Sequence, residues 1–168
     1  MNWIGISGTW QLTSEEVEKD VRLAVRVILE RGDGIVTGGA LGVDSFVVDE
    51  VLSQGLAKVR IKICLPVPFD VYKKHYIKRA EEGVITKKQT ESLITLLDRV
   101  HEENPKAIIE DARFSVCDKE SYYARNGTIV DLSDELYAFQ VNGSSGTQDT
   151  IEKAKSQRKG TKVFSYGL

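Results

Sequence analysis

The 168-residue sequence contains only two cysteines, three prolines and one methionine. Cys64 and Cys117 lie far apart and match neither a metal-ligand spacing nor a redox pair. Cys64 falls inside the apolar run 61–65, which favours a buried position in a strand. Cysteine usage therefore indicates neither a metal centre nor redox chemistry.

No apolar run approaches the roughly 20 residues that a membrane span needs. The first residues, 1–6, have no basic region and no long apolar core of the kind that a targeting signal carries. We therefore expect no membrane association, and by default a cytoplasmic protein.

A strong excess of charge of either sign is also lacking. The 23 basic and 25 acidic residues give a net charge of −2, which offers no support for broad nucleic-acid binding, although a local patch is compatible with it. Apolar residues make up 41% and charged residues 29%, as in an ordinary globular protein. The length suits a single domain, spanning 1–168, with a core of its own.

Short apolar runs alternate with segments of helical periodicity, which is typical of an α/β protein with a parallel sheet. A capping box at Thr13 to Glu16 predicts the start of the first helix. We expect strands at 3–7, 34–37, 59–65, 107–110, 136–141 and 162–165. We expect helices at 13–32, 43–55, 70–104 (broken near Gly83), 119–132 and 147–157. This pattern predicts a single Rossmann-like three-layer sandwich with a mainly parallel sheet.

Two glycine-rich loops each follow an expected strand and open an expected helix: 37–44, TGGALGVD, and 142–147, NGSSGT. Glycines at such a turn let the backbone approach a ligand and leave N–H groups free for an anion, most often a phosphate. Neither loop is a Walker motif or a G-x-G-x-x-G fingerprint. The alternative interpretation is that the glycines only permit tight turns. The presence of two such loops between a strand and a helix makes that interpretation weaker.

A third turn, Ser7-Gly8-Thr9, follows the first expected strand. Ligands of parallel sheets usually bind beyond the carboxyl ends of the strands, where all three turns meet. Hydroxyl groups at helix starts can donate to a phosphate oxygen, although capping of the helix explains each one equally well. The three turns together predict a shared phosphate-binding cleft.

The segment 122–126, YYARN, places a cation beside two aromatic residues. The Arg125 guanidinium could clamp a phosphate and a tyrosine could stack on a base, or the arginine could be solvated and the tyrosines half-buried. Asp44 lies in the first turn of a helix, where it could cap the helix or, if the cleft closes over it, hold a sugar hydroxyl.

The densest basic cluster is 72–79, YKKHYIKR, with Tyr72 and Tyr76 four residues apart on one helical face. Aromatic residues among basic ones suit single-stranded nucleic acid, but a solvated helix face is the more ordinary interpretation. His75 and His101 have no partnering cysteine or carboxylate set, so no metal site is predicted.

These motifs resemble those of a known group. The segment 38–44 resembles the G-G-A-x-G-I-D stretch of the DNA-processing proteins of the DprA/Smf group, and 122–126 followed by 129–133 resembles their Arg-Asn helix. Residues 145–147 match their Ser-Gly-Thr. The Lonely Guy proteins share this layout, and both belong to the SLOG superfamily of Rossmann-like domains. The resemblance covers about residues 3 to 165 and is weak between 70 and 112.

Departures from the Lonely Guy pattern affect its chemistry. These phosphoribohydrolases carry P-G-G-x-G-T-x-x-E, which falls on 142–150 here, with Thr150 in place of the glutamate and Asp149 one position earlier. Arg125 matches their arginine, but Asn126 replaces the following lysine. N-glycosidic cleavage needs a carboxylate, and Asp149 is shorter and points about 100° away around a helix.

The sequence therefore predicts binding of a nucleotide or nucleotide-derived, phosphate-bearing small molecule at the carboxyl ends of the parallel strands, with no separate cofactor. The alternatives are a Lonely Guy-like nucleoside 5′-monophosphate phosphoribohydrolase and, less favoured, DprA-like binding of single-stranded DNA. The resemblance also suggests a homodimer. The expected ligand-binding residues are Ser7, Gly8, Thr9, Gly38, Gly39, Ala40, Gly42, Asp44, Arg125, Asn126, Gly143, Ser144, Ser145, Gly146 and Thr147.

Overall fold

Six parallel strands form one sheet in the computed structural model, which describes all residues from 1 to 168. Across the sheet the order is β4-β3-β2-β1-β5-β6, and every neighbouring pair is parallel. The strands are β1 (Trp3–Gly8), β2 (Gly34–Gly38), β3 (Ile61–Cys64), β4 (Ile108–Ile109), β5 (Glu135–Val141) and β6 (Gly160–Tyr166). The expected α/β class is confirmed, and the sheet is wholly rather than mainly parallel.

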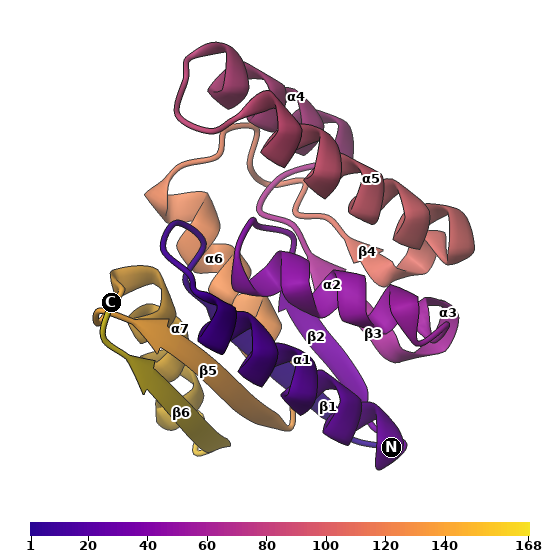
Figure 1. The fold of residues 1–168 in the computed structure, drawn as a ribbon, viewed down its shortest axis with the longest axis vertical. Helices are drawn as coiled ribbons and strands as arrows, with labels where there is room; N and C mark the ends of the chain where they lie inside the picture. The colour runs from indigo at the N-terminus through magenta and orange to yellow at the C-terminus, as the bar shows by residue number, and fades with distance from the viewer.

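Helices cover both faces of this sheet, which makes three layers (Figure 1). The helices are α1 (Glu15–Glu30), α2 (Val43–Ser53), α3 (Ala57–Arg60), α4 (Phe69–Glu81), α5 (Lys87–Glu103), α6 (Lys119–Asp131) and α7 (Ser145–Ser156). In Figure 1, α1 and α2 lie in front of the sheet, α6 and α7 lie behind it, and α4 and α5 form a hairpin at the top. None of these helices has the length and hydropathy that crossing a bilayer requires.

The layers follow from the alternation of side chains along each strand. Ile35 and Ile63 face α1 and α2 and join a cluster of 31 buried apolar residues, whereas their neighbours Val36 and Cys64 face α6 and pack on Ile129. A smaller cluster, including Leu136 and Ala138 of β5, fills the space under α7. Because both faces of the central strands are covered, β1, β2 and β5 are almost entirely buried. The expected burial of Cys64 in a strand is confirmed, and burial raises the pKa of its thiol to about 12.

The chain reverses its direction of travel across the sheet at β1. Strands β1 to β4 are added in order on one side, and α6 then returns the chain to the other side of β1, where β5 and β6 follow. Ligands of open α/β sheets bind at such a switch point, beyond the carboxyl ends of the strands. The topology therefore places a candidate site above β1, β2 and β5.

Several local expectations are corrected by the structure. Ser14, not Thr13, caps α1, because its hydroxyl accepts from the Val17 amide at 3.3 Å. The third strand begins at Ile61 rather than 59, because the residues just before it form the short α3. The break near Gly83 is confirmed: Gly83 has a φ of +76°, and Thr86 then starts α5 with a capping box.

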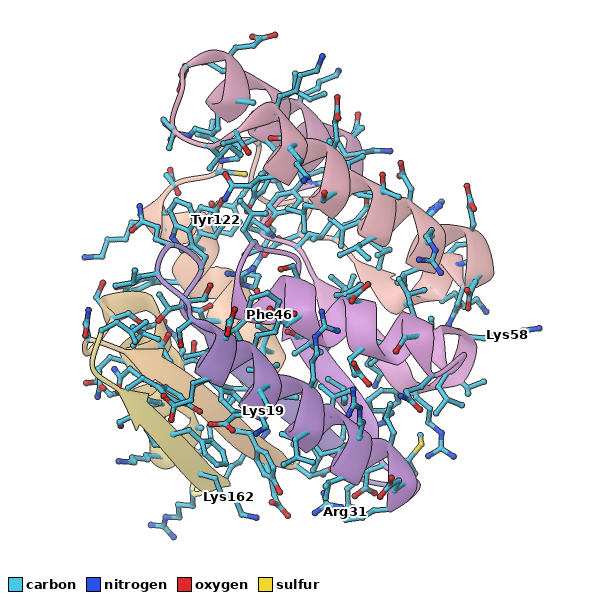
Figure 2. The ribbon with its side chains drawn as sticks, in the orientation of Figure 1. Lys19, Arg31, Phe46, Lys58, Tyr122 and Lys162 are labelled. Atoms are coloured by element: carbon cyan, nitrogen blue, oxygen red, sulfur yellow. The ribbon has the colours of Figure 1, made fainter.

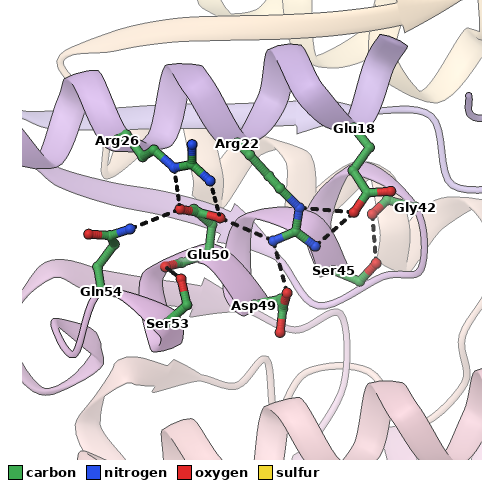
Figure 3. Close-up of polar contacts among 9 residues, drawn as sticks. All are labelled: Glu18, Arg22, Arg26, Gly42, Ser45, Asp49, Glu50, Ser53 and Gln54. Atoms are coloured by element: carbon green, nitrogen blue, oxygen red, sulfur yellow. Dashed lines mark hydrogen bonds and ion pairs between the residues drawn. The ribbon is translucent and has the colours of Figure 1, made fainter. Parts of the chain in front are cut away.

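A buried carboxylate joins α1 to α2 (Figure 3). Glu50 of α2 is only 3% exposed, and it accepts hydrogen bonds from Arg26 at 2.6 Å and from Arg22 at 3.2 Å, both on α1. Gln54 donates a further hydrogen bond to it at 3.0 Å. The hydrogen bond from Arg26 is the main reason that the pKa of Glu50 lies below its ordinary value of 4.5, against the opposing effect of burial.

We expect the Glu50→Gln substitution to lower the free energy of unfolding by about 1–3 kcal/mol at pH 7, because a charge-assisted contact is lost in a buried position. Because the folded-state pKa is depressed, the contribution of Glu50 is fully present above pH 4.5 and is lost as the pH falls through the folded-state value. Urea unfolding across that range should show the two proteins converging at acid pH. Asp49→Asn, at an exposed partner of Arg22, is the matched control and should cost less than about 1 kcal/mol.

Candidate phosphate-binding cleft

A cleft of about 670 Å³ opens above the carboxyl ends of β1, β2 and β5. Its floor comes from the turns that follow these strands, and its walls come from α4, α6 and the α4–α5 connection. Eleven of the fifteen residues predicted from the sequence line it: Ser7, Gly8, Thr9, Ala40, Asp44, Arg125, Asn126, Ser144, Ser145, Gly146 and Thr147. The structure therefore brings three turns and one helix together from distant parts of the chain.

The other four predicted residues, all glycines, are not among the residues that line the cleft. A Cβ atom at Gly39 would come within 2.5 Å of the Leu65 side chain, so this glycine faces the core. Gly42 has a φ of +72°, and a Cβ there would lie 2.4 Å from the Thr9 carbonyl oxygen. Gly42 thus permits the turn after β1 to pack directly against the turn after β2. Gly143 has a φ of +63° and helps to turn the chain into α7.

Asp44 and Arg125 form the electrostatic centre of the cleft. They flank Gly38, where a Cβ atom would lie 2.5 Å from both Arg125 Nη1 and Asp44 Oδ2. Asp44 is 6% exposed and accepts hydrogen bonds from the Thr37 hydroxyl at 3.0 Å and from the Ala40 amide at 3.3 Å. Burial raises the pKa of Asp44, and the nearby Arg125 charge opposes that shift. Asp44 therefore holds the glycine loop, and one amide expected to bind phosphate is already occupied.

Arg125 is almost entirely buried at 9% exposure, yet it keeps unused hydrogen-bonding capacity. Its Nε donates to Asn126 Oδ1 at 3.3 Å, and its guanidinium lies 5.4 Å from the centre of the Tyr122 ring. Its Nη1 is the one buried side-chain nitrogen or oxygen without a hydrogen-bond partner. Burial, the largest single effect, opposes its charge, but Asp44 together with Tyr72, Tyr122 and Tyr76 outweighs burial, and the pKa of Arg125 is raised. A buried unpaired donor of this kind is costly unless a ligand satisfies it.

Hydroxyl groups join the turn after β1 to the turn after β5. Thr9 Oγ1 donates to Ser144 Oγ at 3.1 Å, and Ser144 Oγ donates to Thr147 Oγ1 at 2.8 Å. The same Thr9 oxygen accepts from the Val141 amide at 3.2 Å. Asn126 donates from α6 to the Gly146 carbonyl at 3.3 Å. These contacts fix the start of α7, where residues 144–147 line the cleft and the first backbone N–H groups have no partner within the helix.

The carboxylates near the start of α7 do not enter the cleft. Thr150, at the position of the Lonely Guy glutamate, is fully buried and accepts from the Ser7 hydroxyl at 3.3 Å. Asp149 forms an ion pair with Lys153 at 2.5 Å and accepts from Asn126 at 3.1 Å. Asp44 is consequently the only acidic residue among those that line the cleft.

The wall supplied by α4 was not predicted from the sequence as part of the site. His75, Tyr76 and Arg79 line the cleft from this helix, and Val84 and Ile85 continue the wall beyond it. The sequence feature that could have indicated this wall is the basic cluster 72–79, which from the sequence alone is interpreted as an exposed helix face. The remaining lining residues that sequence reasoning did not assign are Trp10, Gln11, Lys119, Tyr122, Tyr123 and Ile129. The sequence offers a tyrosine of 122–126 for stacking on a base without assigning it to the site. Tyr122, on α6, lies on the side of that helix toward the α4–α5 hairpin (Figure 2).

The two tyrosines of α4 differ in position: Tyr72 supports the glycine loop from within the core, whereas Tyr76 lines the cleft. Tyr72 is fully buried, and its hydroxyl donates to the Gly39 carbonyl at 2.8 Å and lies 3.3 Å from the Tyr76 hydroxyl. Basic residues of the cluster are paired on the outside of the helix: Lys73 with Asp98, and both Lys78 and Arg79 with Glu82. The cluster therefore does not form a continuous stripe of stacking aromatic residues and free cations.

Known structures share this fold. No protein-family model matches the chain, and no curated protein matches it in sequence. DNA processing protein A from Helicobacter pylori, for which a unique single-stranded DNA binding mode is described, superposes with a TM-score of 0.71 at 21% identity. The match covers 96% of this chain and 64% of that one, so the chain spans under two thirds of the length of the H. pylori protein.

Two further structures agree. The structural-genomics protein TM1055 gives a TM-score of 0.58 at 14% identity, covering 96% of this chain and 72% of that one. DprA from Streptococcus pneumoniae gives 0.52 at 16% identity, covering 98% and 59%. At these identities the likeness establishes a common fold, and it confirms the fold that the resemblance to the SLOG superfamily implied.

We expect Gly38→Ala to lower the free energy of unfolding by about 1–3 kcal/mol, because the added methyl group would overlap both Arg125 and Asp44. Gly127→Ala, in α6 two residues after Arg125, is the control: its Cβ would meet nothing closer than Lys153 Cε at 3.8 Å. Since alanine favours helix over glycine, this variant should gain about 0.5–1 kcal/mol. Chemical denaturation of both proteins measures the difference, and equal effects would contradict the crowding at Gly38.

Proposed function

We propose that the cleft binds a nucleotide or nucleotide-derived small molecule, with its phosphate placed between Arg125 and the turn that begins α7. The observation that carries this proposal is the unpaired Nη1 of the buried Arg125, which lines the cleft. A phosphate oxygen would satisfy that donor, and guanidinium groups suit phosphate because they donate through several N–H groups. The backbone amides at the start of α7 would contribute further donors and a favourable helix dipole.

The upper part of the cleft fits the remainder of such a ligand. Tyr76 and Tyr122 line it beside His75, and Trp10 and Ile85 add apolar surface. Aromatic and apolar walls above a few convergent polar groups are typical of small-molecule sites. Asp44 and Asn126 lie on the polar side, where they could address a sugar hydroxyl.

A thermal-shift panel tests this proposal with nucleoside mono-, di- and triphosphates, cyclic nucleotides, ADP-ribose and short single-stranded DNA. A ligand at about 100 times its dissociation constant should stabilise the protein by about 2.7 kcal/mol. Arg125→Ala should cost about 1.5–3 kcal/mol of binding free energy, because a hydrogen bond to a charged group is lost. Arg113→Ala, at an exposed arginine outside the cleft, should bind like the wild type.

Removal of Arg125 also leaves Asp44 buried without its counter-charge, so stability must be separated from binding. The double variant Asp44→Asn/Arg125→Met removes both charges and serves as the folded reference. Titration calorimetry on this variant and the wild type then measures affinity directly. Unchanged affinity in the variants, or a lack of stabilisation by every small nucleotide in the panel, would contradict the proposed site.

Binding of single-stranded DNA is the second candidate, favoured by the common fold with H. pylori DprA. Such binding should weaken steeply with salt and on neutralising Lys73, Lys74, Lys78 and Arg79, because phosphate contacts release counterions. Pairing of most of these cations with acidic residues argues against them as a DNA track. Stabilisation by DNA alone in the same panel would reverse this preference.

Hydrolysis of a nucleoside 5′-monophosphate is the third candidate. Only one carboxylate that could serve this reaction lines the cleft. Asp44 is the acid that lines the cleft, whereas Asp149 is held by Lys153. If turnover occurs, chromatography should detect free base, and Asp44→Asn should abolish its release while Asp149→Asn leaves it nearly unchanged. Loss of activity in Asp149→Asn alone would assign the reaction to the other carboxylate.

A further inference from the structure

The two edges of the sheet differ in how they are protected. Strand β4 forms one edge and is only two residues long, directly after a 3₁₀ turn at Pro105–Ala107. Strand β6 forms the other edge, runs for seven residues and pairs only with β5. Natural proteins usually guard a long edge with proline, a bulge or several charges, because its free N–H and C=O groups invite another strand. The sequence of β6, GTKVFSY, has no proline and a single charge.

The register with β5 assigns the β6 side chains to the two faces of the sheet. Lys162 lies beside Tyr137 and Phe164 beside Phe139, on the face covered by α1. Lys162 Nζ lies 4.8 Å from the centre of the Tyr137 ring, and Phe164 stacks on Phe139 at 4.6 Å. Val163 points to the opposite face and is 42% exposed, while Phe164 is 36% exposed. Figure 2 shows Lys162 on this outer strand, at the margin of the molecule.

We propose that β6 pairs with β6 of a second copy of this chain, antiparallel and about a two-fold axis normal to the sheet that passes midway between the two copies of Val163. The two six-stranded sheets then form one continuous sheet of twelve strands. A two-fold contact of this kind is closed, because the same surface is used on both copies and the short, turn-flanked β4 edges at the ends invite no further pairing.

The strand is complementary to itself in this register. A two-fold axis normal to the sheet keeps matching faces on one side, so each residue meets one of the same face. On the α1 side Lys162 meets Phe164 of the second copy, which places each ammonium group beside an aromatic ring. Gly160 meets Tyr166 there, and an aromatic side chain opposite an edge glycine is a favourable pair. On the other side Thr161 meets Ser165, and Val163 meets its own copy.

Charge and length select this register over its neighbours. A shift by two residues in one direction places Lys162 opposite Lys162 of the second copy, and like charges directly opposite each other are destabilising. The same shift in the other direction places Phe164 opposite itself. Either shift reduces the seven paired positions of Gly160–Tyr166 to five. Only the register centred on Val163 pairs the full strand and separates the two ammonium groups.

Sedimentation velocity and light scattering over about 1 to 100 μM protein test the association. We expect a dimer in the wild type and at least about a tenfold weaker dimer in Val163→Lys, because that change places two like charges on the axis. Val59→Lys is the matched control: Val59 is 57% exposed on α3, at the far side of the sheet, and the dimer should persist. A wild type that stays monomeric, or a Val163→Lys protein that dimerises as the wild type does, would overturn the proposal.

Single cysteines test the register in a Cys117→Ser background, since the other native cysteine, Cys64, is buried. A residue on the axis faces its own copy at a Cα separation of about 4.5–5.5 Å, which a disulfide can bridge. Val163→Cys should therefore form a covalent dimer on mild oxidation, and Lys162→Cys and Phe164→Cys should not. Crosslinking of either neighbour in preference to Val163 would disprove this register, and crosslinking of none would disprove the paired edge.

Discussion

The opposition of Asp44 and Arg125 across Gly38 is the constraint on which the rest of the site depends. Both side chains are buried, and each would be costly without the other, because a lone charge in the interior is poorly solvated. Asp44 accepts hydrogen bonds from the Thr37 hydroxyl and the Ala40 amide, and so fixes the turn after β2. Arg125 is held in place by charge and by Tyr122, and one of its donors stays free. The pair therefore stabilises the loop and at the same time leaves one guanidinium nitrogen of a cleft residue without a hydrogen-bond partner.

Contacts from neighbouring turns and helices hold the Asp44–Arg125 pair in position. Two contacts hold the turn after β2. The Tyr72 hydroxyl donates a hydrogen bond to the Gly39 carbonyl, and the Thr9 carbonyl packs closely against Gly42. The turn after β5 is pinned by Asn126, the neighbour of Arg125 on α6. Three strand ends, α4 and α6 are thus coupled through hydrogen bonds that converge on the cleft. A ligand would enter a site whose floor is already organised, so little ordering would be needed on binding.

The sequence predicted the floor of the cleft better than its walls, and the reason is physical. Apolar runs and glycine turns are local signals, so the strands and the loops that follow them could be located from residue patterns alone. Thr13 was wrongly preferred to Ser14 as a helix cap because adjacent hydroxyl residues offer the same local chemistry. The role of Asp44 depends on Thr37, seven residues away on another element, which no helical pattern reveals. Tyr76 and His75 likewise became cleft residues only because α4 folds over the sheet, in the region of weakest resemblance.

The anion binding that we propose for the cleft rests on local features and not on the overall charge. The molecule carries a net charge of −2, yet the cleft is lined by Lys119, Arg125 and Arg79, the last of them paired with Glu82, against the single acid Asp44. Several cations near the cleft are paired with acidic residues: Lys153 with Asp149, and Lys73 with Asp98. Such paired cations compete little with the cleft for an anion, because an exposed ion pair attracts a third charge only weakly in water. A buried guanidinium with a free donor attracts an anion much more strongly. We therefore expect an anionic ligand to bind at Arg125 rather than at the paired cations of the surface.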